Sequence, residues 1–449
     1  MELHVVERGE SLRRIAEEYI ADVNQAFLLN RIENPKELVA GQTLGVPEVE
    51  EDYVVQPGDN LWLIASNLGV TVKDLVQTND ITNPSLIYVG EMLKIPFFIH
   101  TVKPGEYLWA IALRYDVTIY QILQTNQIES PSLIYPGQTL QIPRKRKPTI
   151  EVNAYTIRMN AQGRQEVLAL GRNFTYLSPF VHSFHRDGSL TEVQGIPMLE
   201  AGNANQVSPL FVITNFREQT FDSDLAATLL RNTQLQETLL TNILKIMKEK
   251  NYAGLTIDFE YVYPEDRENY SIFLRRARER LHPDGFTLST SLAPKEREDQ
   301  KGLLYEAHDY PVHGEIVDFV ILMTYEWGWA GGEPWPIAPI NKMRDVLDYA
   351  ITAIPSNKIM LGIPLYGRDW KIPWEEGTIA QMVSPMEAIN TAAKINVAIQ
   401  YHEVYQSPYY HYVDEGGQEH EVWFEDAKSM QAKYDLIKAY GLRGLVFGY

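Results

Sequence analysis

The sequence predicts an α/β protein in which three small βααβ modules precede a (β/α)8 barrel. A motif recurs three times in the first third of the chain, and from about residue 150 onward short apolar strands alternate with amphipathic helices. Such alternation is typical of a parallel sheet, whose strands are joined by helical crossovers. A pair of acids closes one of these strands, at the end where barrel proteins carry their functional groups.

Each repeat starts with a short strand, a glycine turn and a helix with apolar residues at helical spacing. The three starts span residues 4–12, 53–61 and 100–108. The turn supplies a tight reversal, and the closing segment of each repeat alternates as a half-buried strand does. Repetition of the whole pattern indicates one supersecondary unit used three times. The predicted limits are 1–48, 51–97 and 98–143 for the modules, 144–150 for a basic linker, and 151–449 for the barrel.

These modules resemble LysM domains, which bind glycans that contain N-acetylglucosamine. The first module departs from the pattern, because Arg8 stands where the others have Pro57 and Pro104. We therefore expect it to bind glycan most weakly. The resemblance assigns glycan binding to Gly58, Asp59, Asn60, Asn79, Gly105, Glu106, Tyr107 and Asn126.

The charge balance narrows the classes of partner. The chain has 59 acidic and 40 basic residues and a formal charge of −19. Nucleic acids and anionic membranes require clustered Lys and Arg, so neither is expected as a partner. The absence of cysteine excludes disulfides, thiolate metal sites and a cysteine nucleophile. The first residues lack the features of a signal peptide, so we expect the chain to stay where it is made or to have lost a leader.

Eight strands are predicted in the remainder, which fits a (β/α)8 barrel. A doubly wound sheet is the alternative, but no glycine-rich phosphate loop follows the first strand. The predicted strands are Val152–Tyr155, Tyr176–Ser183, Pro209–Thr214, Gly254–Phe259, Thr287–Ser291, Phe319–Thr324, Ile359–Ile363 and Gly444–Phe447. The predicted helices include Asp224–Lys250, Pro264–Leu281, Ile340–Ala353 and Asp426–Tyr440.

The fourth of these strands carries the acid pair. Because side chains alternate along a strand, Asp258 and Glu260 share one face, and Ile257 and Phe259 share the other. The apolar pair suits the helix layer, which directs both acids into the barrel. Neighbouring carboxylates raise one another's pKa, so one can stay protonated as a general acid. On the residues alone, a metal site or a salt bridge to an arginine is the alternative role for this pair.

The segment Gly254–Glu260 resembles the fourth-strand motif of glycoside hydrolase family 18. The resemblance implies that Glu260 is the general acid and that Asp258 orients the acetamido group of the substrate. Ala253 and Thr256 stand where that motif has its first two acids. The ten histidines show no metal-ligand spacing, and no metal or cofactor is predicted.

Three further segments fit the same family. Leu322–Trp327 resembles its sixth-strand motif, which implies that Tyr325 supports the acetamido carbonyl, while Glu326 replaces the more usual Asp. Leu361–Gly367 resembles the seventh-strand segment. The family's usual Trp at the end of the eighth strand is missing; either Phe447 or Trp327 is expected to replace it, or the carboxyl terminus has been trimmed. The predicted substrate-binding residues are Tyr155, Asn215, Met323, Trp327 and Tyr366, and the loop tryptophans Trp327, Trp329 and Trp335 suit stacking on sugar rings.

LysM modules joined to such a barrel resemble the N-acetylglucosaminidases that act on the cortex peptidoglycan of bacterial spores. The resemblance implies a retaining hydrolase in which the 2-acetamido oxygen of the substrate is the nucleophile. The expected partner is peptidoglycan or another N-acetylglucosamine polymer, bound by a monomer at the coat–cortex boundary of the spore or at the cell wall, with neither nucleic acid nor membrane involved. Two other functions stay open: a chitinase-type endoglycosidase, and a glycan-binding germination or coat protein with low activity.

Overall fold

The computed structural model describes residues 2–19, 21–32, 38–47, 53–68, 70–95, 97–115, 117–143, 149–180, 182–191 and 196–448. The chain divides into two compact units. One contains residues 1–18, 22–46 and 149–449, and we call it the barrel unit. The other contains residues 19–21 and 47–148, and we call it the tandem unit. Most of the predicted basic linker, residues 144–148, lies outside the described residues.

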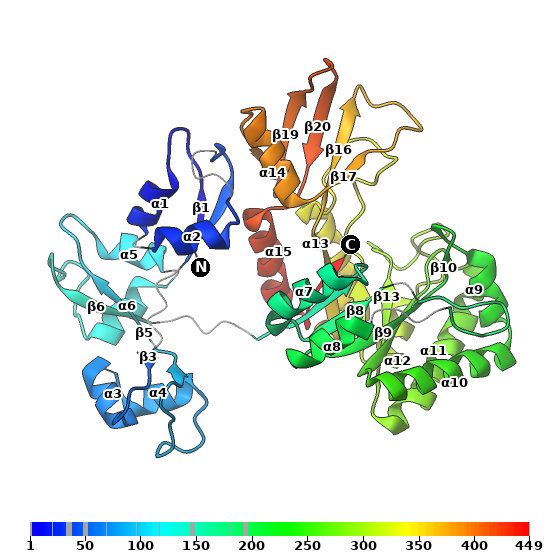
Figure 1. Ribbon diagram of the computed structural model, residues 1–449, viewed down its shortest axis with the longest axis horizontal. Helices are drawn as coiled ribbons and strands as arrows, with labels where there is room; N and C mark the ends of the chain where they lie inside the picture. The colour runs from blue at the N-terminus through cyan, green and yellow to red at the C-terminus, as the bar shows by residue number, and fades with distance from the viewer. Residues whose placement is uncertain are drawn as a thin grey trace. The chain divides into compact units, whose positions relative to one another are not determined.

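Each of the three modules has the predicted βααβ order, with an antiparallel strand pair and two helices (Figure 1). Buried leucine and isoleucine side chains such as Leu61, Ile64, Leu108 and Ile111 give the second and third modules separate hydrophobic cores. Module 1 consists of β1 (Glu2–Val5), α1 (Leu12–Glu18), α2 (Val23–Leu29) and β2 (Thr43–Val46). Module 2 consists of β3 (Tyr53–Val54), α3 (Leu61–Leu68), α4 (Val72–Thr78) and β4 (Met92–Leu93). Module 3 consists of β5 (Phe97–Thr101), α5 (Leu108–Arg114), α6 (Ile119–Asn126) and β6 (Thr139–Pro143).

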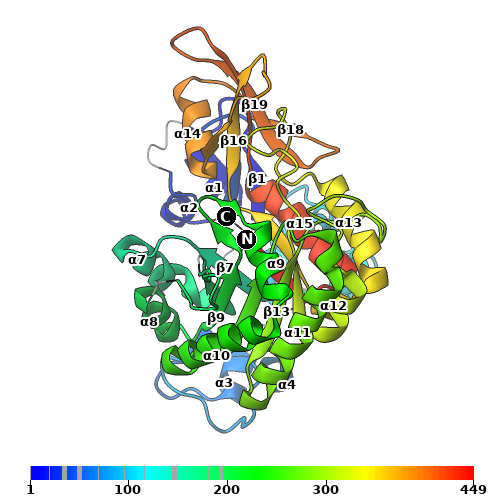
Figure 2. The ribbon, with the colours of Figure 1, turned by 90° about the vertical axis from the view of Figure 1, so that its right-hand side faces the viewer.

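Eight parallel strands form a closed barrel, as predicted, and helices surround it (Figure 2). The last strand pairs with the first, from Gly444 opposite Glu151 to Phe447 opposite Ala154. The strands are β7 (Glu151–Thr156), β8 (Tyr176–Pro179), β9 (Ser208–Thr214), β12 (Gly254–Asp258), β13 (Thr287–Leu292), β14 (Phe319–Leu322), β15 (Ile359–Pro364) and β21 (Gly444–Gly448). The helices between them include α7 (Ala161–Leu170), α8 (Ile196–Ala204), α11 (Arg267–Leu281), α12 (Tyr310–Ile316), α13 (Ile340–Ala353) and α15 (Ala427–Tyr440).

The long helix predicted over Asp224–Lys250 is wrong, because the structure has two helices there. They are α9 (Ser223–Leu230) and α10 (Thr233–Lys250). Asn232 adopts an extended backbone and accepts a hydrogen bond from the N–H of Leu235, which starts a new helix. Because only two residues separate the helices, the apolar residues keep almost the same spacing throughout. The sequence pattern therefore does not indicate the break. A short hairpin, β10 (Phe216–Arg217) with β11 (Thr220–Phe221), precedes α9.

An antiparallel subdomain, residues 367–423, lies between β15 and α15 and was not predicted from the sequence. Figure 1 shows its strands standing at one end of the barrel. Its first strand follows β15 after only two residues, so its start lies at the carboxyl end of the barrel strands. The elements are β16 (Gly367–Ile372), β17 (Gln381–Val383), α14 (Pro385–Lys394), β18 (Gln400–His402), β19 (Ser407–Val413) and β20 (Glu419–Trp423), with strand order β17-β16-β20-β19-β18.

Candidate active site

The alternation of side chains along β12 places the acid pair as the sequence predicts. Ile257 and Phe259 are fully buried in the layer between strands and helices. The Phe259 ring stacks on Phe273 of α11, with ring centroids 5.9 Å apart. Asp258 and Glu260 alternate with these two residues, so they lie on the inner face of the barrel, at the carboxyl end of its strands.

Hydroxyl side chains lie on the same face as Asp258, and one of them, Thr256, stands where the fourth-strand motif has an acid. Thr256, two residues earlier on the same face, forms a 2.8 Å hydrogen bond with Ser289 of β13. Burial raises the pKa of Asp258 to about 6, and a hydrogen bond from Ser291 opposes that rise. The Oδ1 atom of Asp258 has no hydrogen-bond partner within the described residues. The site therefore holds a buried carboxyl group with one free acceptor, which can receive an N–H from a ligand.

The environment of Glu260 favours a protonated carboxyl group. Burial raises its pKa well above the ordinary value, and the negative charges of Asp258 and Glu326 raise it further. A carboxyl group that keeps its proton near neutral pH can donate it to a leaving oxygen. Glu260 thus has the electrostatic setting of a general acid.

Asn215 holds the backbone of Glu260. Its Oδ1 accepts the N–H of Glu260 at 3.0 Å, and its Nδ2 donates to the carbonyl of Glu260 at 2.9 Å and to that of Asp222 at 3.1 Å. The residue is fully buried. Its amide is therefore used by the protein itself, which gives Asn215 a positioning role instead of the predicted contact with substrate.

His308 holds the preceding residue from the other side. Its Nε2 donates to the carbonyl of Phe259 at 2.9 Å, and its Nδ1 accepts the N–H of Ala293 at 2.8 Å. These two bonds define a neutral imidazole with its proton on Nε2. Burial lowers the pKa of His308 to about 4, which agrees with that state. Asn215 and His308 together fix the segment that carries Glu260, and neither contact has a signal in the sequence.

The predicted tyrosines gather around the acids. The pKa of Tyr325 is raised well above its ordinary value, first by burial and then by Tyr366, Asp258, Tyr155 and Glu260. Such mutual effects require these groups to be near one another. The Tyr325 ring packs against two glycines, since a Cβ at Gly362 or Gly448 would lie 2.8 or 2.7 Å from it. The chain thus brings Tyr155, Asp258, Glu260, Tyr325 and Tyr366 into one site.

The antiparallel subdomain supplies a residue that sequence reasoning missed. Arg368 of β16 contacts both carboxylate oxygens of Glu326, at 2.7 and 2.9 Å, and the hydroxyl of Tyr366 also donates to Glu326. Glu326 has a left-handed backbone, with a φ of 68°, which is unusual for a residue other than glycine. The ion pair links the sixth-strand loop to β16. It also keeps Glu326 from acting as a free carboxylate.

The side of the last barrel strand on which Phe447 lies tests its predicted role in the sugar site. Phe447 packs on the outer, helix-facing core, whereas Val446 belongs to the inner cluster of the barrel. The expectation that Phe447 replaces the missing Trp is therefore wrong.

The loop tryptophans differ in their exposure. Trp329 is 56% exposed in its loop, while Trp335 packs edge-on against Tyr405. Tyr449 lies outside the described residues.

The polar residues predicted to bind glycan in modules 2 and 3 shape their own turns. Gly58 and Gly105 have left-handed φ angles of 94° and 80°. Asp59 and Glu106 each accept the backbone N–H of the residue three positions earlier, at 2.7 and 2.8 Å. Asn60 accepts the N–H of the residue three positions later, at 2.9 Å. These contacts fold the turn and leave its neighbouring aromatic side chains to face solvent.

Large exposed aromatic side chains were missed by the sequence analysis, except for Tyr107. A leucine–tryptophan pair that follows both glycine turns, and a tyrosine two residues before Gly90 and Gly137, would have been the signal. Exposed aromatic rings suit stacking on sugar rings. Their exposed fractions are 68% for Trp62, 63% for Tyr88, 65% for Tyr107, 60% for Trp109 and 62% for Tyr135.

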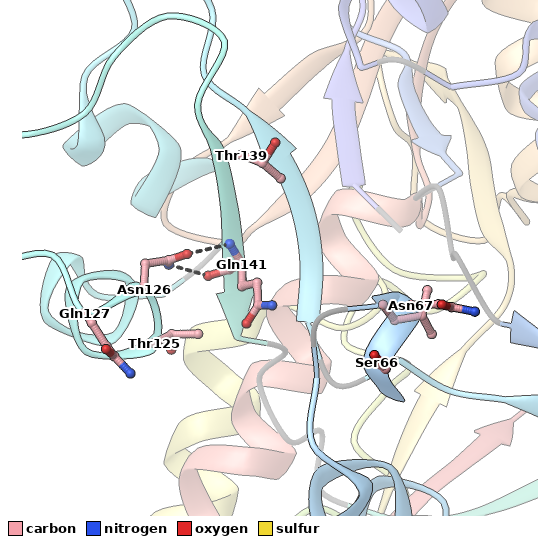
Figure 3. A pocket seen from close by; sticks show the side chains of 8 residues that line it. Ser66, Asn67, Thr125, Asn126, Gln127, Thr139 and Gln141 are labelled. Carbon is pink, nitrogen blue, oxygen red and sulfur yellow. Dashed lines mark hydrogen bonds between the residues drawn. The ribbon is translucent and has the colours of Figure 1, made fainter. Parts of the chain in front are cut away.

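Asn79 and Asn126 close their modules. The Nδ2 of Asn126 donates to the carbonyls of Ile122 and Gln141, at 2.8 and 2.7 Å, and its Oδ1 accepts the N–H of Gln141 at 2.7 Å. Asn126 and Gln141 line an open hollow of about 640 Å³, and Figure 3 shows the hydrogen bonds between them. Asn79 forms the equivalent bonds with Leu75 and Lys94. Both amides are thus used within the fold. The hollow is lined by Ser66, Asn67, Leu68, Thr125, Asn126, Gln127, Thr139 and Gln141.

The described residues contain neither a metal site nor a membrane-spanning helix. No cluster of His, Asp and Glu there could hold a metal ion. None of the helices in the described ranges has the length and apolar character needed to cross a bilayer.

A closed parallel barrel with an acid pair at the end of its fourth strand defines a barrel glycosidase. The sequence matches the family described as glycosyl hydrolases family 18 over residues 219–447. It also matches the LysM domain over residues 4–47, 53–96 and 100–143. The chain belongs to glycoside hydrolase family 18 and carries three LysM domains.

Several relatives are similar over most of their length. The cortical fragment-lytic enzyme of Bacillus subtilis (strain 168) is 42% identical over 67% of this chain and 71% of its own. The enzyme of the same name from Bacillus anthracis is 41% identical over 68% of this chain and 72% of its own length. The crystal structure of the Bacillus cereus spore cortex-lytic enzyme SleL matches with a TM-score of 0.77 and 35% identity, covering 100% of this chain and 94% of that one. The crystal structure of the Bacillus megaterium spore cortex-lytic enzyme SleL matches with a TM-score of 0.69 and 37% identity, covering 88% of this chain and 93% of that one.

The role of His308 can be tested with paired substitutions. His308→Ala is expected to lower kcat by roughly 10- to 100-fold with little change in KM, because the general acid loses its alignment. His308→Gln, which retains a donor for the Phe259 carbonyl, should recover part of the loss. His313→Gln is the matched control, since His313 is equally buried but neither ring nitrogen has a hydrogen-bond partner within the described residues. Steady-state kinetics and thermal unfolding of each variant provide the measurement.

A purely structural role for His308 gives a different result. In that case, His308→Ala and His313→Gln would both lower the melting temperature and leave kcat unchanged. The variant His308→Gln would then show no kinetic recovery, because there would be no kinetic loss to recover.

Glu326→Gln is expected to shift the pH dependence of hydrolysis. Glu260 acts as an acid only while protonated, so kcat/KM falls as the pH rises through its pKa. Removing the negative charge of Glu326 lowers that raised pKa. The alkaline limb should therefore move to lower pH by about half a unit or more. Glu333→Gln, an exposed residue of the same loop, is the control. An unchanged or upward-shifted limb would contradict the assignment of Glu260 as the titrating acid.

Proposed function

We propose that this enzyme hydrolyses β-1,4 bonds at N-acetylglucosamine in spore cortex peptidoglycan. The observation that carries the proposal is the acid pair of buried Asp258 and Glu260, whose pKa is raised, in a family 18 barrel joined to LysM domains. The similarity to cortical fragment-lytic enzymes and to SleL supports the choice of substrate. We place its action at the spore for the same reason.

The proposed mechanism is retaining and assisted by the substrate. The 2-acetamido oxygen attacks the anomeric carbon as the glycosidic bond breaks, and Glu260 gives its proton to the departing oxygen. Water then opens the resulting oxazolinium ion, with Glu260 taking back a proton as general base. Asp258 accepts the acetamido N–H with its free Oδ1, and Tyr325 donates to the acetamido carbonyl, which favours the charged transition state.

The disposition of the other carboxylates supports an acetamido nucleophile. Retaining enzymes that use a protein nucleophile need a second free carboxylate about 5–5.5 Å from the acid. Glu326 is held by Arg368 and Tyr366. Asp258 is only 5% exposed and projects from the same strand as the acid. Glu326 is therefore not a free nucleophile, and in the proposed mechanism Asp258 is used by the acetamido N–H.

We further propose that the LysM domains bind the glycan strand and that the enzyme acts as a monomer. The proposed limits are 1–48, 51–97 and 98–143 for the domains and 151–449 for the barrel. The exposed aromatic rings of modules 2 and 3 supply stacking surfaces for sugars.

Mass spectrometry of reaction products tests the substrate. Purified cortex peptidoglycan should be cut on the reducing side of N-acetylglucosamine, and faster than chitin of similar chain length. The second candidate, a chitinase, is supported by structural similarity to the chitinase of Chromobacterium violaceum, at a TM-score of 0.61 and 25% identity. Faster release of products from chitin would favour it.

A further inference from the structure

Module 1 lacks both exposed aromatic positions of the other two modules. Arg13 stands where the others have Trp62 and Trp109, each directly after the leucine of the glycine turn. Its side chain is 84% exposed and pairs with a glutamate of the same helix. An exposed arginine of this kind offers no rigid ring for a sugar to stack on.

The second aromatic position of module 1 is an apolar residue buried against the antiparallel subdomain. Val39 stands two residues before Gly41, as Tyr88 and Tyr135 stand before their glycines. Val39 is 6% exposed, whereas the tyrosines are 63% and 62% exposed. Its side chain belongs to a hydrophobic cluster of the antiparallel subdomain that includes Ala388, Ala392, Ile399, Tyr410, Val422 and Phe424.

The backbone of the same loop is joined to the subdomain. The N–H of Ile399 donates to the carbonyl of Ala40 at 2.9 Å. A Cβ on Gly41 would lie 1.8 Å from the carbonyl oxygen of Ile399. Gly90 and Gly137 have the same left-handed backbone, but a Cβ there would meet nothing within 4 Å. The turn requires glycine in all three modules, and only module 1 also requires it for a close approach.

A buried hydrogen bond closes the other side of this contact. The hydroxyl of Thr43 donates to Oδ2 of Asp426 at 2.7 Å, and both residues are buried. Asp426 also caps α15 by accepting the N–H of Ser429 at 2.8 Å. The matching residues of modules 2 and 3, Met92 and Thr139, are exposed. Loss of Thr43 would leave part of a buried carboxylate unpaired, which is unfavourable.

We propose that module 1 is a fixed structural part of the barrel unit, docked on α14 and the β18–β20 strands, and that only modules 2 and 3 bind glycan. The docked loop is the one whose counterparts in modules 2 and 3 expose tyrosine to solvent. The contact also supports the sheet that carries Arg368, since β16 pairs with β20. The inference that only modules 2 and 3 bind glycan rests on the proposed function of the LysM domains. The docking of module 1 does not.

Hydrogen exchange on the full chain tests the docking with matched glycine substitutions. Gly41→Ala and Gly90→Ala impose the same strain at positive φ, but only the first places a methyl group against Ile399. Gly41→Ala should speed amide exchange in residues 38–46 and 397–401. Gly90→Ala should change exchange in module 2 alone. Equal exchange at 397–401 in the two variants would overturn the docking.

A second variant covers the case in which Gly41→Ala does not fold. Val39→Asp should lower the melting temperature of the barrel unit by several degrees, because it places a carboxylate in an apolar cluster. The melting temperature of the tandem unit should not change. An unchanged melting temperature of the barrel unit would show that the loop is not docked.

Sedimentation with insoluble peptidoglycan tests the binding half. Trp62→Ala and Trp109→Ala in the full chain should each weaken binding, by up to roughly 10²-fold if the two modules act together. Arg13→Ala should bind like the unmodified chain. Weaker binding by Arg13→Ala, to the extent seen for the tryptophan variants, would overturn the inference. If the unmodified chain does not sediment at all, the proposed function of the domains fails, whereas the exchange result for Gly41→Ala still decides the docking.

Discussion

Glu260→Gln is expected to lower kcat/KM for glycan hydrolysis by roughly 10²–10⁴-fold, with folding and glycan binding retained. Glutamine keeps the shape of the side chain but has no proton to give to the leaving oxygen. Asn215 and His308 hold the backbone of residues 259 and 260, so the substitution leaves the segment in place. The loss therefore measures proton transfer alone. Initial rates on soluble peptidoglycan fragments, together with thermal unfolding, provide the measurement.

The control for this variant is Glu265→Gln. Glu265 follows the same strand but is largely exposed, and its pairing with Arg231 is at 3.5 Å. It should keep full activity. Glu260→Gln should also lose the alkaline limb of the pH profile, because the group whose ionisation limits the rate is gone. Turnover near that of the unmodified enzyme on a substrate with a poor leaving group would show that another residue supplies the proton.

The barrel and its acid pair were predictable because both follow from local periodicity. Strand parity alone places Asp258 and Glu260 opposite Ile257 and Phe259, and the buried apolar pair decides which face is inward. Nothing in that argument needs a contact between distant residues. The same reasoning explains why the parity of Val446 and Phe447 excludes the latter from the sugar pocket.

The missed residues depend on contacts between distant segments. Asn215 reaches the backbone of a residue 45 positions later, and His308 reaches one 49 positions earlier. An asparagine or histidine beside a strand has the same sequence signal whether it binds substrate or backbone. The antiparallel subdomain was missed because strands such as Gln381–Val383 and Gln400–His402 are too short to show a period. Arg368, which pairs with Glu326, was missed with it.

The sequence predicts that module 1 binds glycan most weakly, and the docking proposed above gives a second, physical reason for the same prediction. Arg8 at the turn marks module 1 as different in sequence. Val39 is buried in a cluster of the antiparallel subdomain and Thr43 bonds to Asp426, so this loop is not free to meet a glycan. A valine in a loop is not distinctive in a sequence. It becomes informative only when its counterparts are exposed tyrosines.

Removal of the N-acetyl group from the sugar at the cleavage position is expected to slow hydrolysis by roughly 10³-fold or more, because the substrate then lacks its own nucleophile. Binding should persist, since modules 2 and 3 are proposed to bind the glycan away from the cleavage position. Comparison of cleavage rates and sedimentation for acetylated and de-N-acetylated peptidoglycan fragments separates the two effects. Equal cleavage of both substrates would show that the acetamido group takes no part.

A thiazoline analogue of N-acetylglucosamine should inhibit, because it resembles the oxazolinium ion that the site stabilises. Asp258→Ala should weaken this inhibition by roughly 10- to 100-fold, the value of a hydrogen bond to a charged group. The reason is that Oδ1 of Asp258 is the buried acceptor left free for the ring nitrogen. Glu265→Gln should leave the inhibition constant unchanged. A covalent adduct between the sugar and a carboxylate of the protein, trapped in mass spectra, would show instead that the protein supplies the nucleophile.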